Sequence, residues 1–264
     1  MTMSIFSTLT LTRNAHTATV TLNRPEVRNA FNALAIAELT EVFDTLGQDA
    51  SVRAIVLRAN GSAFCAGADL QWMRQMAGFS NAENLADATL LARMLCAIYR
   101  CPKPVVACVQ GDCYAGGMGL VAACDIAVVA DQVQFCLSEV RLGLIPATIS
   151  PYVIRAMGEN AARRYFLTAE RFEAHEALRI GFVHKVVATA ELDGAVSEVV
   201  DAMCKASPHA VREAKRLVRE IAGAVPNESV IADTAHRIAE IRASAEGREG
   251  VQAFLDKRKP GWLV

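Results

Sequence analysis

One stretch of the sequence occurs twice, and this repeat limits the folds that the chain can adopt. Residues 54–70, AIVLRANGSAFCAGADL, align without a gap with residues 104–120, PVVACVQGDCYAGGMGL. Each copy reads as a buried strand, a polar turn, a loop of small residues and the start of a helix. The matched positions include Gly61 with Gly111, Phe64 with Tyr114, Gly67 with Gly117 and Leu70 with Leu120. The repeat therefore predicts two copies of one supersecondary unit, side by side.

The small-residue loops of the two copies indicate a use for the repeat. At the start of a helix, the first backbone N–H groups have no partner within the helix and can point at a negative charge. Two such loops side by side could supply two convergent donors, which is the geometry of an oxyanion hole. The glycine-rich segment CYAGGMGL, residues 113–120, is thus the first candidate functional segment.

The remaining sequence divides into two regimes. Up to about residue 140, strand-like runs such as TATVTL (17–22) and DIAVVA (125–130) alternate with helical segments, which indicates an α/β fold. One early helix is expected to carry an apolar face formed by Leu34, Leu39, Val42, Phe43 and Leu46. From about residue 150 the pattern is helical and is broken only by GFVHKVV at 181–187. Long amphipathic helices are expected over 207–225 and 227–245.

Charge and hydropathy argue against several classes of partner. The 264 residues carry 27 Lys and Arg against 28 Asp and Glu, a net charge of −1, so nucleic acid is not an expected partner. The N-terminal region shows no basic segment followed by an apolar block, and no apolar stretch reaches the ~18 residues of a membrane span. We therefore expect a cytoplasmic protein without a membrane partner.

Neither a metal nor a bound redox cofactor is expected from the motifs. The eight cysteines form no CxxC pair and lie mostly inside apolar runs, as free core thiols do. Residues 117–122, GMGLVA, fit the dinucleotide fingerprint GxGxxA, and Glu139 follows at a suitable spacing. That fingerprint needs its first glycine in a tight turn directly at the strand end, whereas QGDCYAG intervenes here. A nicotinamide or flavin site is therefore not expected.

At five places the sequence resembles the crotonase, or enoyl-CoA hydratase/isomerase, superfamily. The motifs are TLNRPEVRNAFN, SAFCAGADL, VQGDCYAGGMGL, ACDIAVVADQVQFCLSEVRLGLIP and EGREGVQAFLDKRKPGW. The resemblance implies an α/β spiral of repeated ββα units with the acyl-CoA site in residues 1–200, and a C-terminal helical trimerisation region in residues 201–264. It also implies a homotrimer or homohexamer that binds acyl-CoA thioesters, with coenzyme A as part of the substrate and no separate cofactor.

Carried over by motif, the resemblance assigns the oxyanion-hole donors to the backbone N–H groups of Ala68, in AGAD, and Gly116, in AGGMG. These donors would bind the thioester carbonyl oxygen as negative charge develops on it during enolate formation. In the alternative interpretation, Gly116 and Gly117 only permit close helix packing.

Hydratases of this family usually carry two glutamates that hold a water molecule. The second matches Glu139, in LSEVRLG, whereas the first falls on Gly119, which cannot transfer a proton. Either one carboxylate suffices, or another group, such as one on the substrate, supplies the second function. Ala147 is a further departure, because it replaces a glycine whose backbone helps to seat the water. Asp112 and Tyr114 compete for the vacant role, although a turn aspartate more often caps backbone N–H groups.

Within the family, the motifs FCAGADLQWMRQM and FCLSEVRLGLIPATISPY most resemble the bacterial branch assigned to methylglutaconyl-CoA hydration in leucine breakdown. Such a substrate carries a free carboxylate, so a cation beside the acyl group is expected. Arg74 is the candidate for that cation, and Arg141 and Arg155 are the alternatives.

Further substrate contacts are implied on both sides of the thioester. Coenzyme A is expected to meet Arg24, Arg28, Lys257 and Lys259, the lysines from a neighbouring subunit. The remaining expected contacts are Ala66, Asp69, Leu70, Gly117, Gly119 and Ala147. Asp69 is also expected to cap the helix that starts beside it rather than to act as an acid.

Three functions remain open on the sequence alone. The first is a hydratase for a branched or carboxylated 2-enoyl-CoA, with methylglutaconyl-CoA as the best candidate. The second is a double-bond isomerase, or another enolate chemistry, with Glu139 as its single base. The third is a non-catalytic acyl-CoA binder. Loss or gain of absorbance at the enoyl thioester band would distinguish among them.

Overall fold

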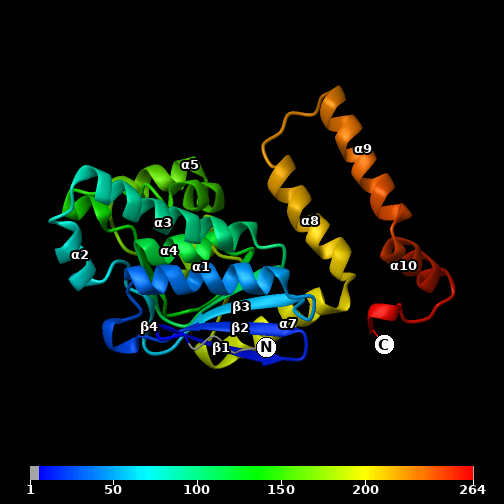
Figure 1. Cartoon of the computed structure of the whole chain (residues 1–264), viewed down its shortest axis with the longest axis horizontal. Coiled ribbons are helices and arrows are strands. Elements are labelled where there is room, and N and C mark those ends of the chain that lie inside the picture. Colours follow the sequence, from blue (N-terminus) through cyan, green and yellow to red (C-terminus); the bar gives the residue numbers. More distant parts are fainter. Residues whose placement is uncertain (1–5, 264) are drawn as a thin grey trace.

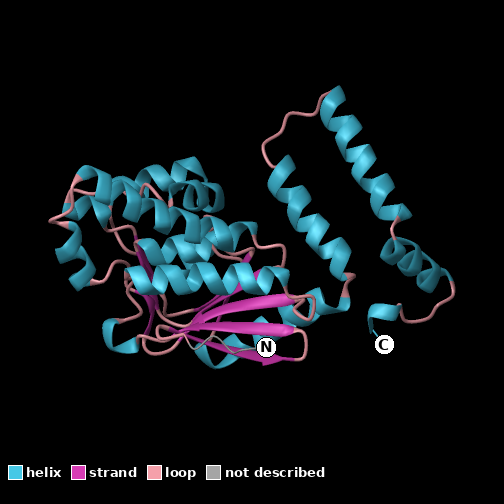
Figure 2. Ribbon diagram, in the orientation of Figure 1, coloured by secondary structure: helices cyan, strands magenta, loops and turns pink. Residues whose placement is uncertain are grey.

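The computed structural model describes residues 6–263, and its centre is a six-stranded sheet (Figures 1 and 2). The strand order is β1-β2-β3-β5-β7-β10, in which β1 and β2 are antiparallel and every later pair is parallel. Its strands are β1 (Leu9–Asn14), β2 (Thr17–Leu22), β3 (Ala54–Ala59), β5 (Val105–Val109), β7 (Ile126–Ala130) and β10 (Lys185–Val187). The continuous apolar runs of β3, β5 and β7 are explained by burial on both faces of a parallel sheet.

A second sheet of four short strands runs beside the first. Its order is β4-β6-β8-β9, and its strands are β4 (Ala63–Cys65), β6 (Asp112–Tyr114), β8 (Gln134–Cys136) and β9 (Phe172–Glu173). The β4, β6 and β8 strands are parallel, so their carboxyl ends lie at one edge. Each of them follows a strand of the large sheet, which gives three ββ units: β3 with β4, β5 with β6, and β7 with β8.

The predicted repeat is confirmed in the first strand of each copy. In the β3–β5 pair Ile55 lies opposite Val105 and Leu57 opposite Ala107, which is the same 50-residue offset that the sequence shows. The second strands do not keep this offset: Ala63 lies opposite Asp112 and Cys65 opposite Cys113, with a register shift between the two pairs. The repeated units are therefore direct neighbours in both sheets.

The helix starts do not keep the offset. Helix α2 (Leu70–Met76) begins after Asp69, which accepts hydrogen bonds from Gln71 and Trp72, whereas α4 (Gly116–Ala123) begins directly after β6. Leu70 and Leu120, aligned in the sequence, thus occupy different positions in their helices. The capping function expected for Asp69 is confirmed.

Four helices lie together over the sheet in Figure 1. They are α1 (Ala33–Gln48), α3 (Asn81–Arg100), α4 and α5 (Ser150–Thr168), and α1 packs on α3, α3 on α4, and α4 on α5. The expected apolar face of α1 is confirmed at Leu39, Val42, Phe43 and Leu46, each at most 1% exposed. Leu34 is wrong as a member of this face: it is 48% exposed, in the first turn of the helix.

The helical part of the chain begins after residue 150, as expected, but it includes one strand that the pattern missed, β9. The last three residues of GFVHKVV form β10, and α7 (Leu192–Lys205) packs against β3, β5 and β7. The other short elements of this part and of the loops are α6 (Ala174–Arg179) and the 3-10 turns η1 (Pro25–Val27), η2 (Glu139–Leu142), η3 (Thr189–Glu191) and η4 (Gly261–Leu263). No helix in residues 6–263 is both long and apolar enough to span a membrane.

The last three helices form a C-terminal arm, α8 (Pro208–Ile221), α9 (Glu228–Ala243) and α10 (Ala245–Leu255). Figure 1 shows the arm at one end of the long axis, with β4 and α2 at the other end. The predicted domain boundary after residue 200 falls inside α7, and the chain leaves the body at Ser207, the N-cap of α8. Neither α8 nor α9 contains a buried residue.

Candidate active site

Three of the residues expected to act on the substrate follow the ends of three neighbouring parallel strands. Ala68 comes shortly after β4, Gly116 directly starts the helix after β6, and Glu139 starts the 3-10 turn after β8. Since β4, β6 and β8 are adjacent in this order, their carboxyl ends bring the three residues to one edge of the small sheet. A Cβ atom built on Gly67 would lie 3.9 Å from the Gly116 nitrogen, so the first two loops are in direct proximity.

The loop around Ala68 is held by the chain segment before α1. The Phe31 N–H donates to the Gly67 carbonyl oxygen and the Asp69 N–H donates to the Phe31 carbonyl oxygen, each over 2.7 Å. These bonds bracket Ala68, whose own N–H donates to no acceptor within residues 6–263. The same is true of the Gly116 N–H, which is the first donor of α4. Both expected oxyanion-hole donors are therefore unpaired.

Backbone strain at Ala115 sets the direction of the second donor. Ala115 has φ 47° and ψ −122°, a conformation that a residue with a side chain rarely adopts. Its N–H donates to the Cys136 carbonyl oxygen over 2.8 Å, and its carbonyl oxygen accepts from Met118. Such strain costs about 1–3 kcal/mol and persists where neighbouring structure enforces it, commonly at functional sites.

The glycines of this loop also serve packing. A Cβ on Gly116 would lie 2.7 Å from Cε2 of Phe31, and one on Gly117 would lie 2.8 Å from both Cβ and the carbonyl oxygen of Cys65. Glycine is thus required sterically at both positions. For Gly116, close packing and the free N–H are compatible, because the side chain and the amide point in different directions.

Glu139 has the surroundings of a proton-transfer group. It is half-buried, and its Oε2 atom is buried without a hydrogen-bond partner in the described chain. Burial raises the pKa of this carboxyl above its ordinary value, while a hydrogen bond from its own backbone N–H opposes the rise in part. A raised pKa brings a carboxyl closer to the operating range of a general acid or base.

The position expected for a second glutamate is not open. A Cβ atom on Gly119 would lie 2.2 Å from Cγ2 of Ile149, which is only 1% exposed. Hydrocarbon therefore fills the position at which these hydratases carry their first glutamate, and contact of Gly119 with substrate stays a prediction. The sequence does not indicate this contact, because α4 and the start of α5 are brought together only by the tertiary fold.

The loop before α5 uses its own backbone groups. The Ala147 N–H donates to the Ile145 carbonyl oxygen over 2.8 Å, and the Ala147 carbonyl oxygen accepts from Ser150. That amide is not free to seat a water molecule, and a role for Ala147 in substrate binding stays a prediction.

Arg24 and Asp69 are bound to each other. Arg24 Nη2 donates to Asp69 Oδ2 over 2.8 Å, and its Nη1 donates to the Ala30 carbonyl oxygen. Burial favours protonated Asp69, but hydrogen bonds from Arg24, Gln71 and Trp72 outweigh it and lower the pKa. The pair braces the loop that carries Ala68, a function that sequence reasoning missed. Contact of either side chain with substrate remains a prediction.

Arg28 lies in a cluster with Asp112 and Tyr114 of β6, the strand that precedes the glycine loop. Its guanidinium lies 6.0 Å from the ring centre of Tyr114 and 3.6 Å from Asp112, and Arg171 lies 5.5 Å from the same ring. Tyr114 donates to Asp112, and burial together with this bond raises the pKa of Tyr114 to about 12. Asp112 and Tyr114 therefore pair with each other. Sequence reasoning missed Arg171, because only the fold brings it to Arg28. Ala66, one of the expected substrate contacts, donates its backbone N–H to the Arg28 carbonyl oxygen.

The three arginines considered for a substrate carboxylate differ in their bonding. Arg141 Nη2 donates to the Ala169 carbonyl oxygen, so this guanidinium holds the end of α5. Arg74, in the last turn of α2, and Arg155, in α5, are exposed, and no ion pair joins them to a described residue. Leu70, at the start of α2, is 70% exposed. Arg74 and Arg155 remain the candidates.

Lys257 and Lys259 follow α10 at the far end of the arm. Figure 1 places this end of the chain opposite to β4 and α2 along the long axis. The two lysines are therefore remote from the site of their own chain, and only a neighbouring subunit could bring them to a bound coenzyme A.

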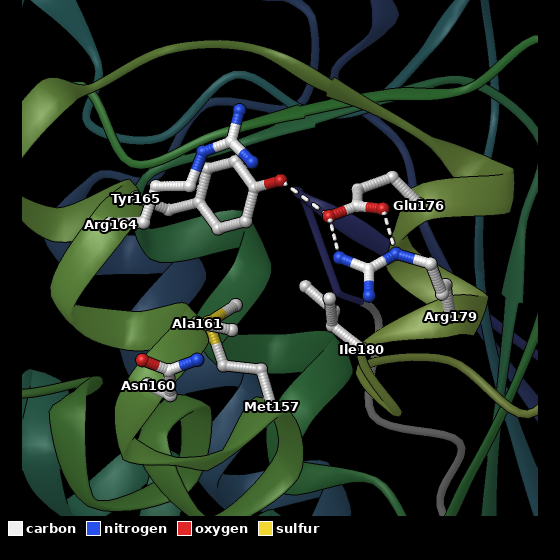
Figure 3. Close-up of a pocket in the computed structure, with 8 residues that line it drawn as sticks. All are labelled: Met157, Asn160, Ala161, Arg164, Tyr165, Glu176, Arg179 and Ile180. Carbon is white, nitrogen blue, oxygen red and sulfur yellow. Dashed lines mark hydrogen bonds and ion pairs between the residues drawn. The ribbon is translucent and has the colours of Figure 1, made fainter.

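A separate hollow of about 360 Å³ lies between α5 and α6 (Figure 3). Three of its polar side chains bond to one another: Tyr165 donates to Glu176 over 2.8 Å, and Arg179 forms two hydrogen bonds with the same carboxylate. No predicted site residue lines it, so it is not the candidate active site. In residues 6–263 no group of His, Cys, Asp and Glu side chains has the arrangement of a metal site.

Two unpaired N–H donors and one carboxyl group with a buried oxygen thus lie at one edge of stacked ββα units, an arrangement suited to stabilising an oxyanion while a proton is transferred. The family model for enoyl-CoA hydratase/isomerase matches residues 12–263, and the chain belongs to this family. A crystal structure of an enoyl-CoA hydratase from Shewanella pealeana is 42% identical, with a TM-score of 0.95 over 97% of this chain and 96% of that chain.

Two further relatives are similar over most of their length. An enoyl-CoA hydratase structure from Mycobacterium smegmatis is 36% identical, with a TM-score of 0.91 over 97% of this chain and 99% of that chain. Mevalonyl-coenzyme A hydratase sidH of Aspergillus fumigatus is 32% identical over 94% of this chain and 91% of its own. The fold, a crotonase-like spiral, and the enzyme class expected from the sequence are thus confirmed.

Proposed function

We propose that the protein adds water across the 2,3 double bond of a branched or carboxylated enoyl-CoA, with methylglutaconyl-CoA as the best candidate. The observation that carries the proposal is Glu139, a half-buried residue with one buried, unpaired carboxyl oxygen, at the strand-end edge that also presents the free N–H groups of Ala68 and Gly116. Coenzyme A enters as part of the substrate, and the proposal uses no other cofactor.

The proposed reaction needs one protein carboxylate. The thioester oxygen accepts hydrogen bonds from Ala68 and Gly116, which withdraws electrons from the double bond. Ionised Glu139 takes a proton from water as the water oxygen bonds to the β-carbon, and the electron pair of the double bond moves to the thioester as an enolate. Glu139 then returns the proton to the α-carbon, so that one H and one OH are added.

The substrate class is supported by the absence of a second protein carboxylate and by the name of one relative. Because Ile149 closes the position of a second protein carboxylate, a polar group of the substrate would be needed to help Glu139 hold the water, which favours a substrate that carries one over a plain short chain. The sidH relative is named for mevalonyl-coenzyme A, a thioester with a branched acyl group. Arg74 or Arg155 would meet the substrate carboxylate, and Arg28 with Arg171 would meet the phosphates of coenzyme A.

A second candidate function, double-bond isomerisation, is supported by the same absence of a second carboxylate. Double-bond isomerisation moves a proton between two carbons of one enolate, so a single carboxylate suffices, and Glu139 would do this work alone.

The unpaired cysteines, all eight of them in the described chain, fit a reducing compartment such as the cytoplasm.

One assay with one variant tests the proposal. Methylglutaconyl-CoA and crotonyl-CoA should lose absorbance at the enoyl thioester band, the first substrate faster, and Glu139→Gln should lower turnover by about 10²–10⁴ while coenzyme A still binds. A gain of absorbance from a 3-enoyl-CoA would instead support isomerisation. Unchanged turnover in Glu139→Gln would contradict both.

A further inference from the structure

Gly119 and Ile149 are interlocked. Gly119 lies on α4, one turn after Gly116, and a Cβ built on it would lie 2.2 Å from Cγ2 and 2.8 Å from Cβ of Ile149, and 3.4 Å from Cδ2 of Leu95. The Cβ of Ile149 is fixed to the backbone, so rotation of a side-chain end cannot relieve the clash. Any side chain at position 119 would require α4 or α5 to move.

The interlock lies one helical turn after Gly116, one of the two expected oxyanion-hole donors. A side chain on a helix covers the turn that precedes its own Cα, and for position 119 that turn begins at Gly116. A side chain at this position would therefore point toward the free N–H group. Ile149 occupies this direction instead, and it is held there because its carbonyl oxygen accepts from the N–H groups of Tyr152 and Val153 in the first turn of α5.

The space around the interlock is dry hydrocarbon. Ile149 is 1% exposed and Leu95 is fully buried. A carboxylate placed there would clash with Ile149 and would also lose its hydration. An unpaired buried charge is among the costliest changes in a core. The two departures from the hydratase pattern, at position 119 and in the loop before α5, are thus one feature.

We propose that Ile149 is a reaction-determining residue of this site: its side chain fills the position from which a second acid or base would act, and so leaves Glu139 to exchange both protons. The inference rests on the proposed function and deepens it. Because Glu139 then holds the attacking water without a second carboxylate, we predict slower turnover of short unbranched enoyl-CoA, whose acyl group has no polar group to help hold that water.

A double-mutant cycle tests the proposal. Gly119→Glu alone should lower the thermal midpoint strongly, and Ile149→Ala alone should fold with a smaller loss and no gain on crotonyl-CoA. The combined Gly119→Glu and Ile149→Ala variant should recover thermal midpoint relative to Gly119→Glu. It should also hydrate crotonyl-CoA at least about tenfold faster than Ile149→Ala, a part of what a positioned proton-transfer group supplies.

Val153→Ala is the matched control, because Val153 is fully buried one turn further along α5. Combined with Gly119→Glu it should not restore the thermal midpoint. Recovery with Val153→Ala equal to that with Ile149→Ala, or a wild-type midpoint for Gly119→Glu alone, would overturn the interlock. A folded double variant without the gain on crotonyl-CoA would overturn the reaction-determining role. Failure of the proposed function would appear in a separate measurement, as a wild-type protein that is inactive on every enoyl-CoA. The thermal midpoints, which test the interlock, are measured without substrate.

Discussion

Glu139 is kept in surroundings that oppose its charge, which is a cost to the folded state. Burial raises its pKa in the folded protein above the unfolded value, so its contribution to stability is fully present below the unfolded pKa and is lost as the pH rises through the folded pKa. At neutral pH the ionised carboxylate is thus less well accommodated by the folded chain than by the unfolded chain. Active-site groups commonly carry such a cost.

Glu139→Gln should therefore stabilise the fold at neutral pH. The amide cannot ionise, so the free energy of unfolding of the variant, relative to wild type, should rise as the pH is raised from about 4.5 toward 8. Urea unfolding at several pH values measures this difference, in which the other titrating groups cancel. A difference that is constant with pH, or that falls, would show that the carboxyl is not disfavoured by burial.

Gly116 allows its two functions to be separated by a pair of substitutions. Gly116→Ala keeps the N–H but brings a Cβ to within 2.7 Å of Phe31, and Gly116→Pro brings the same contact and removes the N–H. We expect Gly116→Pro to turn over about 10²–10³ times more slowly than Gly116→Ala, as for the loss of one oxyanion-hole donor. Coenzyme A affinity, measured by calorimetry, should differ little between the two. Equal losses of turnover and affinity would mean that Gly116 is only structural.

At the scale of elements, the sequence predicted those parts of the repeat that are specified locally. The apolar runs of β3 and β5 share one pattern and one length, and their register equals the offset of the sequence alignment. The third unit, β7 with β8, was not recognised as a copy, because its strands are followed by the η2 turn and not by a glycine loop. Glu139 was identified from the family resemblance, although it also follows the end of a strand, β8, as Gly116 follows β6.

The features that the sequence did not predict are contacts between distant segments. Helix α2 starts where Asp69 caps it, which the sequence signals, but α4 starts where the Cys136 carbonyl holds strained Ala115, which it does not. The bond from Arg24 to Asp69 spans 45 residues. The filling of the space at Gly119 by Ile149 depends on how two helices pack, and neither residue type indicates it alone.

A partly buried ion pair fastens the arm to the body. Lys215, on α8, lies 2.7 Å from Asp125 in the turn before β7, and its side chain is 9% exposed. Asp125 also accepts from the Val105 N–H at the start of β5, and Lys215 donates to the Lys103 carbonyl oxygen. Burial raises the pKa of Asp125, and the charge of Lys215 opposes that rise. The pair thus ties α8 to the centre of the large sheet.

Lys215→Met should destabilise the fold by about 2 kcal/mol at neutral pH. This lies between the values for surface pairs and fully buried pairs, since Asp125 keeps some exposure. Without Lys215 the pKa of Asp125 rises further, so the loss should grow as the pH rises through the acid range. Urea unfolding measures it, and Asp125→Asn with Lys215→Met is the control that removes the pH dependence. A loss that is the same at every pH would assign the effect to packing alone.

At the scale of the whole molecule, the chain exposes more surface than a compact monomer of its size. A globular monomer of 28.4 kDa is expected to expose roughly 11,000 Å², whereas this chain exposes 14163 Å². The excess has the size of an obligate subunit interface, about 2,000–5,000 Å² in total. Much of it lies on the arm, which stands away from the body in Figure 1 and exposes Val218 to 70%, Ile231 to 55% and Phe254 to 82%.

We therefore predict a trimer or hexamer in solution, with the arm helices covered by neighbouring subunits. Light scattering at micromolar concentration should give three or six times the chain mass of 28.4 kDa. Val218→Lys, which puts a charge on the exposed face of α8, should shift the mass toward the monomer, because desolvating an unpaired charge in an interface is costly. Leu85→Lys on α3, where the native side chain is 68% exposed on the body, is the matched control and should leave the mass unchanged. A monomeric wild-type mass would contradict the prediction, and it would also leave Lys257 and Lys259 with no route to a bound coenzyme A.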